Sequence, residues 1–209
     1  MPGGRIKRGD GLMLPLVEEF FSVQGEGYHS GTAAYFIRLG GCDVGCSWCD
    51  TRFAWDPDLH PMIKTDDIIR TAVNSGADSA VITGGEPLMW NLDYLCSALQ
   101  HEKIRTFIET SGTYPISGKW DWICLSPKIN IPPVGNIWRM ADELKVIVEK
   151  ESDIEKAVSY RNFVRKDCRL FLQPEWSRFS KIIPAIVNYV KENPEWRISL
   201  QIHKYMHIP

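Results

Sequence analysis

The segment CDVGCSWC, residues 42–49, places Cys42, Cys46 and Cys49 within eight residues of a 209-residue chain. Thiolates bind zinc or iron–sulfur clusters, and a closed site of either kind normally takes four protein ligands. Three thiolates in one loop therefore leave one coordination position open. The spacing favours a cluster with an open iron, and a zinc knuckle stays the alternative. The other cysteines are isolated in the sequence and are expected to be buried small side chains: Cys96, Cys124 and Cys168.

A second motif, TGGEP at residues 83–87, follows the apolar-rich run at residues 79–82. A short run of this kind that ends in paired glycines predicts a buried parallel strand opening into a loop. Glycines at such a point let a ligand approach the backbone directly. Paired glycines taken alone favour an ordinary corner between a strand and a helix, so the motif gains weight from its position some forty residues after the cysteines.

Composition bounds the class of protein. Apolar residues make up 44% of the chain and charged residues 24%, as in an ordinary globular enzyme. The net charge of −2 provides no basic field for nucleic acid. No apolar run reaches the ~18 residues of a membrane span. We expect a mobile tail over residues 1–13, a single domain over 14–209, reduced cysteines, and a cytoplasmic protein that binds neither nucleic acid nor membrane.

Strand-like and helix-like segments alternate along the chain. The predicted strands cover residues 16–21, 34–39, 79–83, 104–109, 122–125, 143–148, 169–173 and 197–202. One predicted helix covers residues 65–74 with Thr65 as its N-cap, and another runs to Val190 with Ser180 as its cap and Pro184 in its first turn. This alternation predicts an α/β fold with a mostly parallel sheet and ligands at the carboxyl ends of its strands.

The two motifs together resemble the signatures of the radical S-adenosylmethionine superfamily. The resemblance implies a [4Fe-4S] cluster on Cys42, Cys46 and Cys49 whose open iron chelates S-adenosylmethionine. Electron transfer then releases a 5′-deoxyadenosyl radical in that superfamily. It also implies that the parallel sheet is a partial, open (β/α) barrel.

Further motifs, in order from about residue 15 to the end, resemble the 7-carboxy-7-deazaguanine synthase family. They are SVQGEG at 22–27, CDT at 49–51, ETSG at 109–112, SPK at 126–128 and LQIHKY at 200–205. The family comprises lyases of queuosine and deazapurine biosynthesis, a tRNA modification pathway. They convert 6-carboxy-5,6,7,8-tetrahydropterin to 7-carboxy-7-deazaguanine with loss of ammonia. The resemblance implies S-adenosylmethionine and Mg²⁺ as cofactors, a flavodoxin-type reductant and a homodimer.

The candidate substrate contacts have a chemical rationale. A pterin edge presents amide-like donors and acceptors, which suit backbone groups, amides and carboxylates. A substrate carboxylate suits the planar guanidinium of Arg38, for which a surface salt bridge is the alternative. His203, expected in a strand, is a candidate hydrogen-bonding or proton-transfer group and could equally be structural. The complete set is Val23, Gln24, Gly25, Glu26, Arg38, Thr83, His203 and the chain end at Pro209.

The candidate cofactor contacts follow the predicted strands. Lys128 is expected to meet the carboxylate of S-adenosylmethionine, and Gln173 its adenine or ribose. The complete set is Gly85, Glu86, Ser111, Ser126, Pro127, Lys128, Gln173, Pro174, Glu175 and Trp176. Thr51 is the candidate Mg²⁺ ligand, and because one hydroxyl is a sparse site we expect substrate to complete it. No role is assigned to Asp50, Glu109 or Lys204.

Two rival functions remain at this point. A glycyl-radical activating enzyme shares both superfamily signatures but needs an open groove for a partner polypeptide. A zinc- or cluster-containing RNA-binding module would need a basic, aromatic-rich surface, which the charge balance does not predict. The three-residue loop between Cys42 and Cys46 is the plain superfamily form, whereas some members of the synthase family carry an enlarged loop there.

Overall fold

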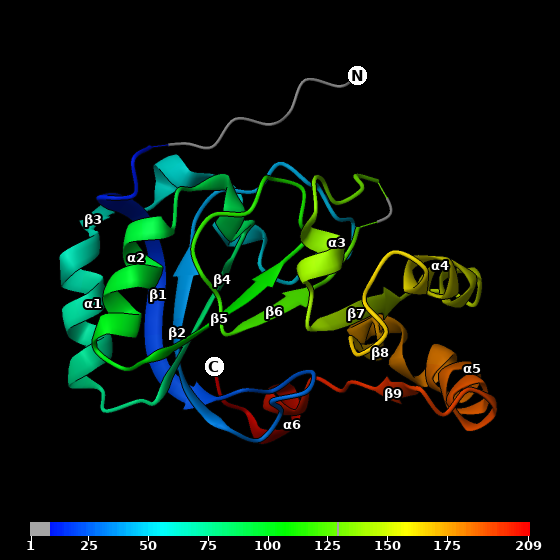
Figure 1. Ribbon diagram of the computed structural model, residues 1–209. Helices are drawn as coiled ribbons and strands as arrows, with labels where there is room; N and C mark the ends of the chain where they lie inside the picture. Colours follow the sequence, from blue (N-terminus) through cyan, green and yellow to red (C-terminus); the bar gives the residue numbers. More distant parts are fainter. Residues whose placement is uncertain (1–8, 129) are drawn as a thin grey trace.

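The computed structural model describes residues 9–128 and 130–209, and their strands form a single nine-stranded sheet (Figure 1). The strands are β1 Met13–Val23, β2 Ala33–Leu39, β3 Met62–Lys64, β4 Ser79–Gly84, β5 Arg105–Thr110, β6 Trp122–Leu125, β7 Glu143–Val148, β8 Arg169–Pro174 and β9 Trp196–Ile198. The helices are α1 Thr65–Asn74, α2 Asp93–His101, α3 Ile137–Met140, α4 Ser152–Arg161, α5 Phe179–Glu192 and α6 Ile202–Met206. Short 3-10 turns are η1 Arg52–Ala54, η2 Pro57–Leu59, η3 Pro87–Met89 and η4 Trp176–Arg178.

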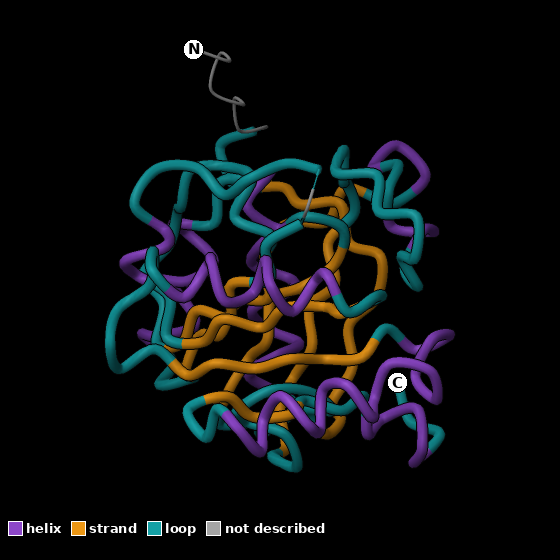
Figure 2. The backbone as a smooth tube through the Cα atoms, turned by 90° about the vertical axis from the view of Figure 1, so that its right-hand side faces the viewer, coloured by secondary structure: helices purple, strands orange, loops and turns teal. Residues whose placement is uncertain are grey.

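The sheet is mostly parallel and does not close. Its order is β3-β1-β2-β4-β5-β6-β7-β8-β9, and only β1 pairs antiparallel with its neighbours β2 and β3. Every pair from β2–β4 to β8–β9 is parallel. Figures 1 and 2 show helices packed along the curved sheet, and the labels of Figure 1 place α1 and α2 toward one end and α4 and α5 toward the other. The expected open α/β barrel is confirmed, with one antiparallel strand, β1, between β2 and the edge strand β3.

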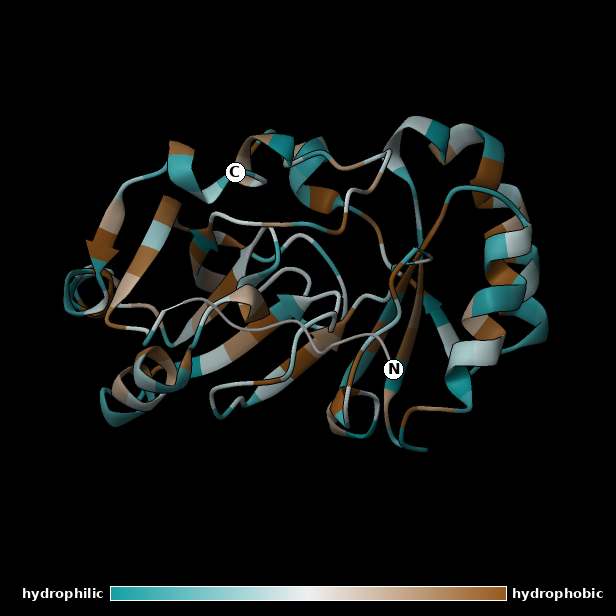
Figure 3. Cartoon of the chain, turned by 90° about the horizontal axis from the view of Figure 1, so that it is seen from above, coloured by the Kyte–Doolittle hydropathy of each residue, from teal (hydrophilic) through white to brown (hydrophobic). Residues whose placement is uncertain are grey.

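The two faces of the sheet carry different side chains because successive residues of a strand point to opposite faces. In β7, Leu144, Val146 and Val148 belong to the main core beneath the helices. The alternate residues of β7, Lys145 and Ile147, line an internal cavity instead. Figure 3 shows the same alternation of hydrophobic and hydrophilic residues along the strands. The outer face therefore holds the fold together, and the inner face is available for chemistry.

A small apolar cluster closes one end of that inner face. Its buried members are Ala34, Phe36, Val81 and Phe107, with Phe20 and Trp122 packed against them. Those on the parallel strands lie near the start or middle of the strand, and Phe20 of the antiparallel β1 lies opposite Phe36, so the polar residues that follow on the parallel strands are left at their carboxyl ends. The apolar cluster thus forms a floor that separates the polar cavity from the amino ends of the strands.

The predicted strands are confirmed except for the last: the bounds of 122–125 and 143–148 are as predicted, and the others have shifted ends. β9 ends at Ile198, and residues 202–206 form α6, so the strand predicted over 197–202 is wrong beyond residue 198. The three-residue strand β3 was not predicted, because so short a run has no periodicity to detect. α1 begins at Thr65, whose hydroxyl donates to the Gly11 carbonyl at 2.6 Å instead of capping the helix.

The remaining helix expectations also need correction. α5 begins at Phe179 without a side-chain cap from Ser180, and Pro184 therefore lies inside the helix beyond its first turn.

Most of the tail expected over residues 1–13 lies outside the described residues. Its described end is attached, since Thr65 N donates to the Leu12 carbonyl at 2.9 Å and β1 begins at Met13. Among the helices of the described ranges, none combines the length and apolar character needed to cross a membrane.

Candidate active site

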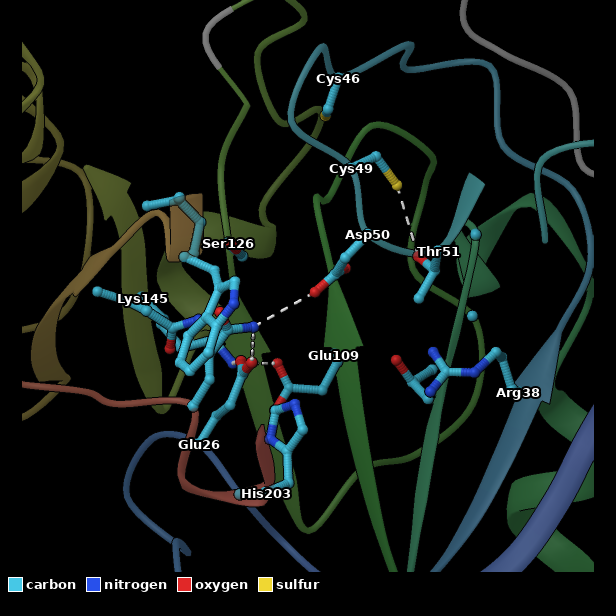
Figure 4. Close-up of a pocket in the computed structure, with 18 of the residues that line it drawn as sticks. Glu26, Arg38, Cys46, Cys49, Asp50, Thr51, Glu109, Ser126, Lys145 and His203 are labelled. Carbon is cyan, nitrogen blue, oxygen red and sulfur yellow. Dashed lines mark hydrogen bonds and ion pairs between the residues drawn. The ribbon is translucent and has the colours of Figure 1, made fainter. Parts of the chain in front are cut away.

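A cavity of about 340 Å³ opens where the carboxyl ends of the parallel strands meet three other segments. Those segments are the cysteine loop, the turn η4 and the C-terminal helix α6. In the close-up of Figure 4, Cys46 and Cys49 lie at one end of this space and Glu26, Glu109 and His203 at the other. The cavity is therefore built at the position that parallel α/β folds use for ligands.

The cysteine loop supplies three free thiols to the cavity wall. Cys42, Cys46 and Cys49 line the cavity, and the remaining cysteines are buried elsewhere in the described chain. Burial raises the pKa of Cys42 to about 11, so a cationic ligand is needed to keep it as a thiolate at neutral pH. The indole of Trp55 donates to Cys49 Sγ at 3.3 Å, as it would to a metal-bound thiolate.

The donor set fits a three-cysteine cluster better than a zinc ion. Within the described residues, no three His, Cys, Asp or Glu side chains converge on a single ion. The three sulfurs instead share the wall of one cavity, which accommodates a larger group. Cys42, Cys46 and Cys49 would hold a [4Fe-4S] cluster, whose fourth iron position would face the open cavity.

The TGGEP loop packs directly on the cysteine loop. Gly85 N donates to the Leu39 carbonyl at 3.0 Å, and Glu86 N donates to the Gly41 carbonyl at 2.8 Å. A Cβ on Gly85 would lie 2.3 Å from that Gly41 oxygen, so only glycine permits this approach. Gly84 has φ of +137°, a second reason for glycine here.

Glu86 organises this region from behind the wall. Its side chain is 1% exposed and accepts hydrogen bonds from Leu88 N at 3.0 Å and Ser111 N at 2.8 Å. The hydroxyls of Thr110 and Ser111 also donate to it. Glu86 and Pro127 are set back from the cavity lining, unlike the other expected cofactor contacts. In this structure Glu86 therefore holds Ser111 in place, and its own side chain lies behind the cavity wall.

Several expected cofactor contacts already have partners that orient them. Lys128 donates to Ser126 Oγ at 2.7 Å, and burial lowers the pKa of its ammonium. Gln173 accepts from Ser199 Oγ at 2.6 Å through Oε1, and its side chain also hydrogen-bonds to Glu26. Both oxygens of Glu175 cap the turn η4, at 3.0 Å from Ser177 N and from Arg178 N. Glu175 therefore acts first as a structural cap.

His203 lies on α6 rather than in a strand, and its ring covers Gly25. Ile202 N donates to the Gly25 carbonyl at 2.9 Å, and a Cβ on Gly25 would lie 2.2 Å from His203 Nδ1. The glycine of SVQGEG is thus required by a residue 178 positions later in the chain. Burial lowers the pKa of His203, so the imidazole is neutral at pH 7.

A buried ion cluster lies at the opposite end of the cavity from the cysteines. Lys145 Nζ is 2.6 Å from Glu26 Oε2 and 2.9 Å from Glu109 Oε2. Burial alone would raise the pKa of Glu26, but the charge and hydrogen bond of Lys145, together with hydrogen bonds from Gln201 and Gln173, outweigh it and hold that pKa at about 2. The sequence reasoning missed Lys145. A lysine inside the otherwise apolar stretch at 144–148 was the available signal.

Arg38 and Thr51 flank the space between these two ends. Figure 4 places Arg38 across the cavity from Lys145. Its Nε pairs with Glu18 Oε1 at 2.7 Å, so the salt bridge is present, and the contact of the terminal nitrogens with a substrate carboxylate stays a prediction. Thr51 Oγ1 lies 3.5 Å from Cys49 Sγ and faces the cavity beneath the cysteine loop.

The C-terminal segment covers part of the cavity. Lys204 on α6 pairs with Asp50 of the cysteine loop at 2.7 Å and lies 5.1 Å from the centre of the Trp176 ring. Pro209 lines the cavity, and its carbonyl accepts from Ser22 Oγ at 3.5 Å. Asp50 and Lys204, to which the sequence assigned no role, thus connect the cover to the cluster loop.

Apart from Glu86 and Pro127, the structure brings the predicted site residues to this one cavity. They are Val23, Gln24, Gly25, Glu26, Arg38, Thr51, Thr83, Gly85, Ser111, Ser126, Lys128, Gln173, Pro174, Glu175, Trp176, His203 and Pro209, together with the three cysteines. Shared location is what the structure establishes for them. Their individual contacts with ligands stay predictions.

The open parallel sheet and the three-cysteine loop define a radical S-adenosylmethionine protein, and the Radical SAM superfamily model matches residues 36–124. A 7-carboxy-7-deazaguanine synthase from Flavobacterium psychrophilum is 53% identical over 199 residues, covering 95% of this chain and 94% of that protein. The chain belongs to the 7-carboxy-7-deazaguanine synthase family.

Other comparisons agree with this assignment. The synthase of a Synechocystis strain is 42% identical over 195 residues, which is 93% of each chain. The crystal structure of QueE from Escherichia coli superimposes with a TM-score of 0.79 at 30% identity, covering 90% of this chain and 94% of that one. The similarity therefore extends over nearly the whole length of both proteins.

Replacing Cys46 with alanine should prevent assembly of the cluster, because it removes one of three protein thiolates. We expect Cys46→Ala, reconstituted anaerobically with iron and sulfide, to lose reductive cleavage of S-adenosylmethionine. Cys168→Ala, which alters a buried thiol outside the cavity, should retain about four irons per chain. Formation of 5′-deoxyadenosine by Cys46→Ala at the wild-type rate would contradict the assignment.

Proposed function

We propose that the chain converts 6-carboxy-5,6,7,8-tetrahydropterin to 7-carboxy-7-deazaguanine with release of ammonia. Family membership supports this proposal, and the polarity of the cavity carries it. The guanidinium of Arg38 lies across the space from the Glu26 carboxylate. The proposed substrate has the complementary polarity, with a carboxylate at one end and N–H donors at the other.

The chain's own residues would divide the cavity between cofactor and substrate. When bound, the cluster and S-adenosylmethionine supply a carbon-centred radical that removes a hydrogen atom from the substrate. Gly85, Ser126, Lys128 and Gln173 would orient the cofactor near the cysteine loop, and Arg38 would hold the substrate carboxylate. Such positioning governs rate and fidelity, because the radical must meet one carbon–hydrogen bond and little else.

The cover over the cavity bears on the rival radical enzyme. A glycyl-radical activating enzyme must admit a loop of a partner polypeptide. Here α6 and Pro209 line one side of the cavity, and Lys204 ties α6 to Asp50. A partly covered space with a few convergent polar groups suits a small heterocycle.

Product analysis tests the proposal most directly. Reconstituted protein supplied with S-adenosylmethionine, a reductant and 6-carboxytetrahydropterin should form 7-carboxy-7-deazaguanine, identified by mass spectrometry. A protein that cleaves S-adenosylmethionine but leaves the pterin unchanged would refute the substrate. On the resemblance we also propose a flavodoxin-type reductant and a homodimer, which reduction kinetics and light scattering would examine.

We propose Mg²⁺ as a further cofactor, bound by Thr51 and completed by substrate oxygens. One neutral hydroxyl is a weak site by itself, so the ion and the substrate should bind together. Thr51→Ala should therefore form product with a weaker response to added Mg²⁺ and with unchanged iron content. A variant whose Mg²⁺ titration overlays that of the wild type would exclude this role.

Arg38→Ala should uncouple cofactor cleavage from product formation. A hydrogen bond to a charged group is worth about 1.5–3 kcal/mol, so its loss should lower kcat/KM roughly ten- to a hundredfold. The cluster should remain, and slow formation of 5′-deoxyadenosine should persist. Arg38→Lys should restore only part of the activity, because one ammonium cannot form the paired contacts of a guanidinium. Near-wild-type product formation by Arg38→Ala would show that the carboxylate is held elsewhere.

A further inference from the structure

Lys145 is the most deeply buried charged group that faces the cavity. Its side chain is 4% exposed, and its ammonium lies between two carboxylates that reach it from different parts of the chain. Glu26 comes from the loop after β1, and Glu109 from the carboxyl end of β5. Burying an ammonium is costly unless it is paired, so its position is explained only together with both acids.

Each of the two carboxylates is held at both of its oxygens. Lys145 contacts Oε2 of Glu26 and Oε2 of Glu109. An amide holds the other oxygen in each case: Gln201 donates to Glu26 Oε1 at 2.8 Å, and Gln24 donates to Glu109 Oε1 at 3.4 Å. The two acids are thus fixed against one nitrogen, with one more negative charge than the single ammonium balances.

We infer that Lys145 is a positioning residue, which holds Glu26 and Glu109 side by side as acceptors for the N–H-donor edge of the substrate. The inference rests on the proposed function and explains how the site would distinguish its substrate from similar heterocycles. Carboxylate oxygens each accept several hydrogen bonds, so the bonds to Lys145 and the amides leave capacity for a ligand. A heterocycle with amidine-like N–H groups matches two fixed acceptors, whereas a carbonyl at the same place would be repelled.

The other titratable groups around Lys145 do not take over its role of holding the two carboxylates. Glu143, on the same face of β7, accepts from Tyr28 N and Trp122 Nε1 at 3.1 Å each, away from the cavity lining. Burial raises the pKa of Glu143 to about 7, so near neutrality it is at least partly protonated. The ion cluster also interacts electrostatically with Cys124, Lys128 and His203.

The pKa of Glu26 determines how the activity of a variant without Lys145 should change with pH. With Lys145 present, the pKa of Glu26 is about 2, so the acid is ionised throughout the working range. Without the ammonium, burial becomes the dominant influence and the pKa of Glu26 rises. Substrate recognition by the ionised form should then be lost as the pH falls through the raised pKa, and the acid limb of activity should move to higher pH.

The test compares Lys145→Met with Lys145→Arg, using Lys191→Met on the exposed face of α5 as the matched control. For each protein, kcat/KM is measured across pH for 6-carboxytetrahydropterin and for its analogue with oxygen in place of the 2-amino group. Iron content and substrate-free cleavage of S-adenosylmethionine report on the rest of the site.

Wild type and Lys191→Met should prefer the amino substrate by at least about a hundredfold. Lys145→Met should lose about tenfold or more of that preference and show its acid limb at higher pH, with iron content unchanged. Lys145→Arg should keep the wild-type acid limb and regain part of the preference. A folded Lys145→Met with the wild-type preference and pH profile would overturn the inference.

Two further outcomes are separable. If Lys145→Met does not fold, Glu109→Gln removes one acid while Lys145 remains paired with Glu26. The preference of Glu109→Gln for the amino substrate should then fall, and an unchanged preference would overturn the inference.

If wild type converts no pterin, the proposed function fails. In that event, fluorescence titration with 6-carboxypterin tests Lys145 alone: weaker binding by Lys145→Arg and Glu109→Gln supports the carboxylate pair, and unchanged binding refutes it.

Discussion

The parallel hydrogen-bond ladder from β2 to β8 determines which side chains can meet in the cavity. Arg38 pairs with Thr83, Glu109 with Cys124, and Ile147 with Gln173, so residues distant in the sequence are neighbours at the carboxyl ends of the strands. Because side chains alternate between faces, a shift of one residue in any pair would move these groups into the apolar core. The chemistry of the site therefore depends on the register of the sheet.

Sequence reasoning located the strands and the loops that end them because those signals are local. The apolar run before TGGEP and the cysteine spacing are each contained in a few residues. The error at residues 197–202 has a physical cause: after Ile198 the chain leaves the sheet, and Ile202 N bonds to Gly25 in a loop near the other end of the chain. A long-range hydrogen bond of that kind leaves no periodic pattern.

The part of the site that the sequence did not reveal is the part built by long-range pairing. Glu26 was a predicted substrate contact, but its pairing with Lys145 and Glu109 joins three separate segments and was not predicted. Glu86 shows the converse case. It belongs to a recognisable motif, yet its carboxylate is used within the protein to hold Leu88, Thr110 and Ser111. Membership in a motif identifies a region of the site more reliably than it identifies a contact.

The attachment of α6 to the cysteine loop has a consequence for how the cavity wall responds to salt. The Asp50 carboxylate is 54% exposed, and an ion pair at such a surface contributes about 0–1 kcal/mol, less at higher ionic strength. The strands beneath are held by continuous ladders and a buried core, so lifting the helix costs far less than opening the sheet. The link between α6 and the cysteine loop is therefore the part of the cavity wall that added salt weakens most, whereas the hydrogen bond from Ile202 N to the Gly25 carbonyl does not depend on an ion pair.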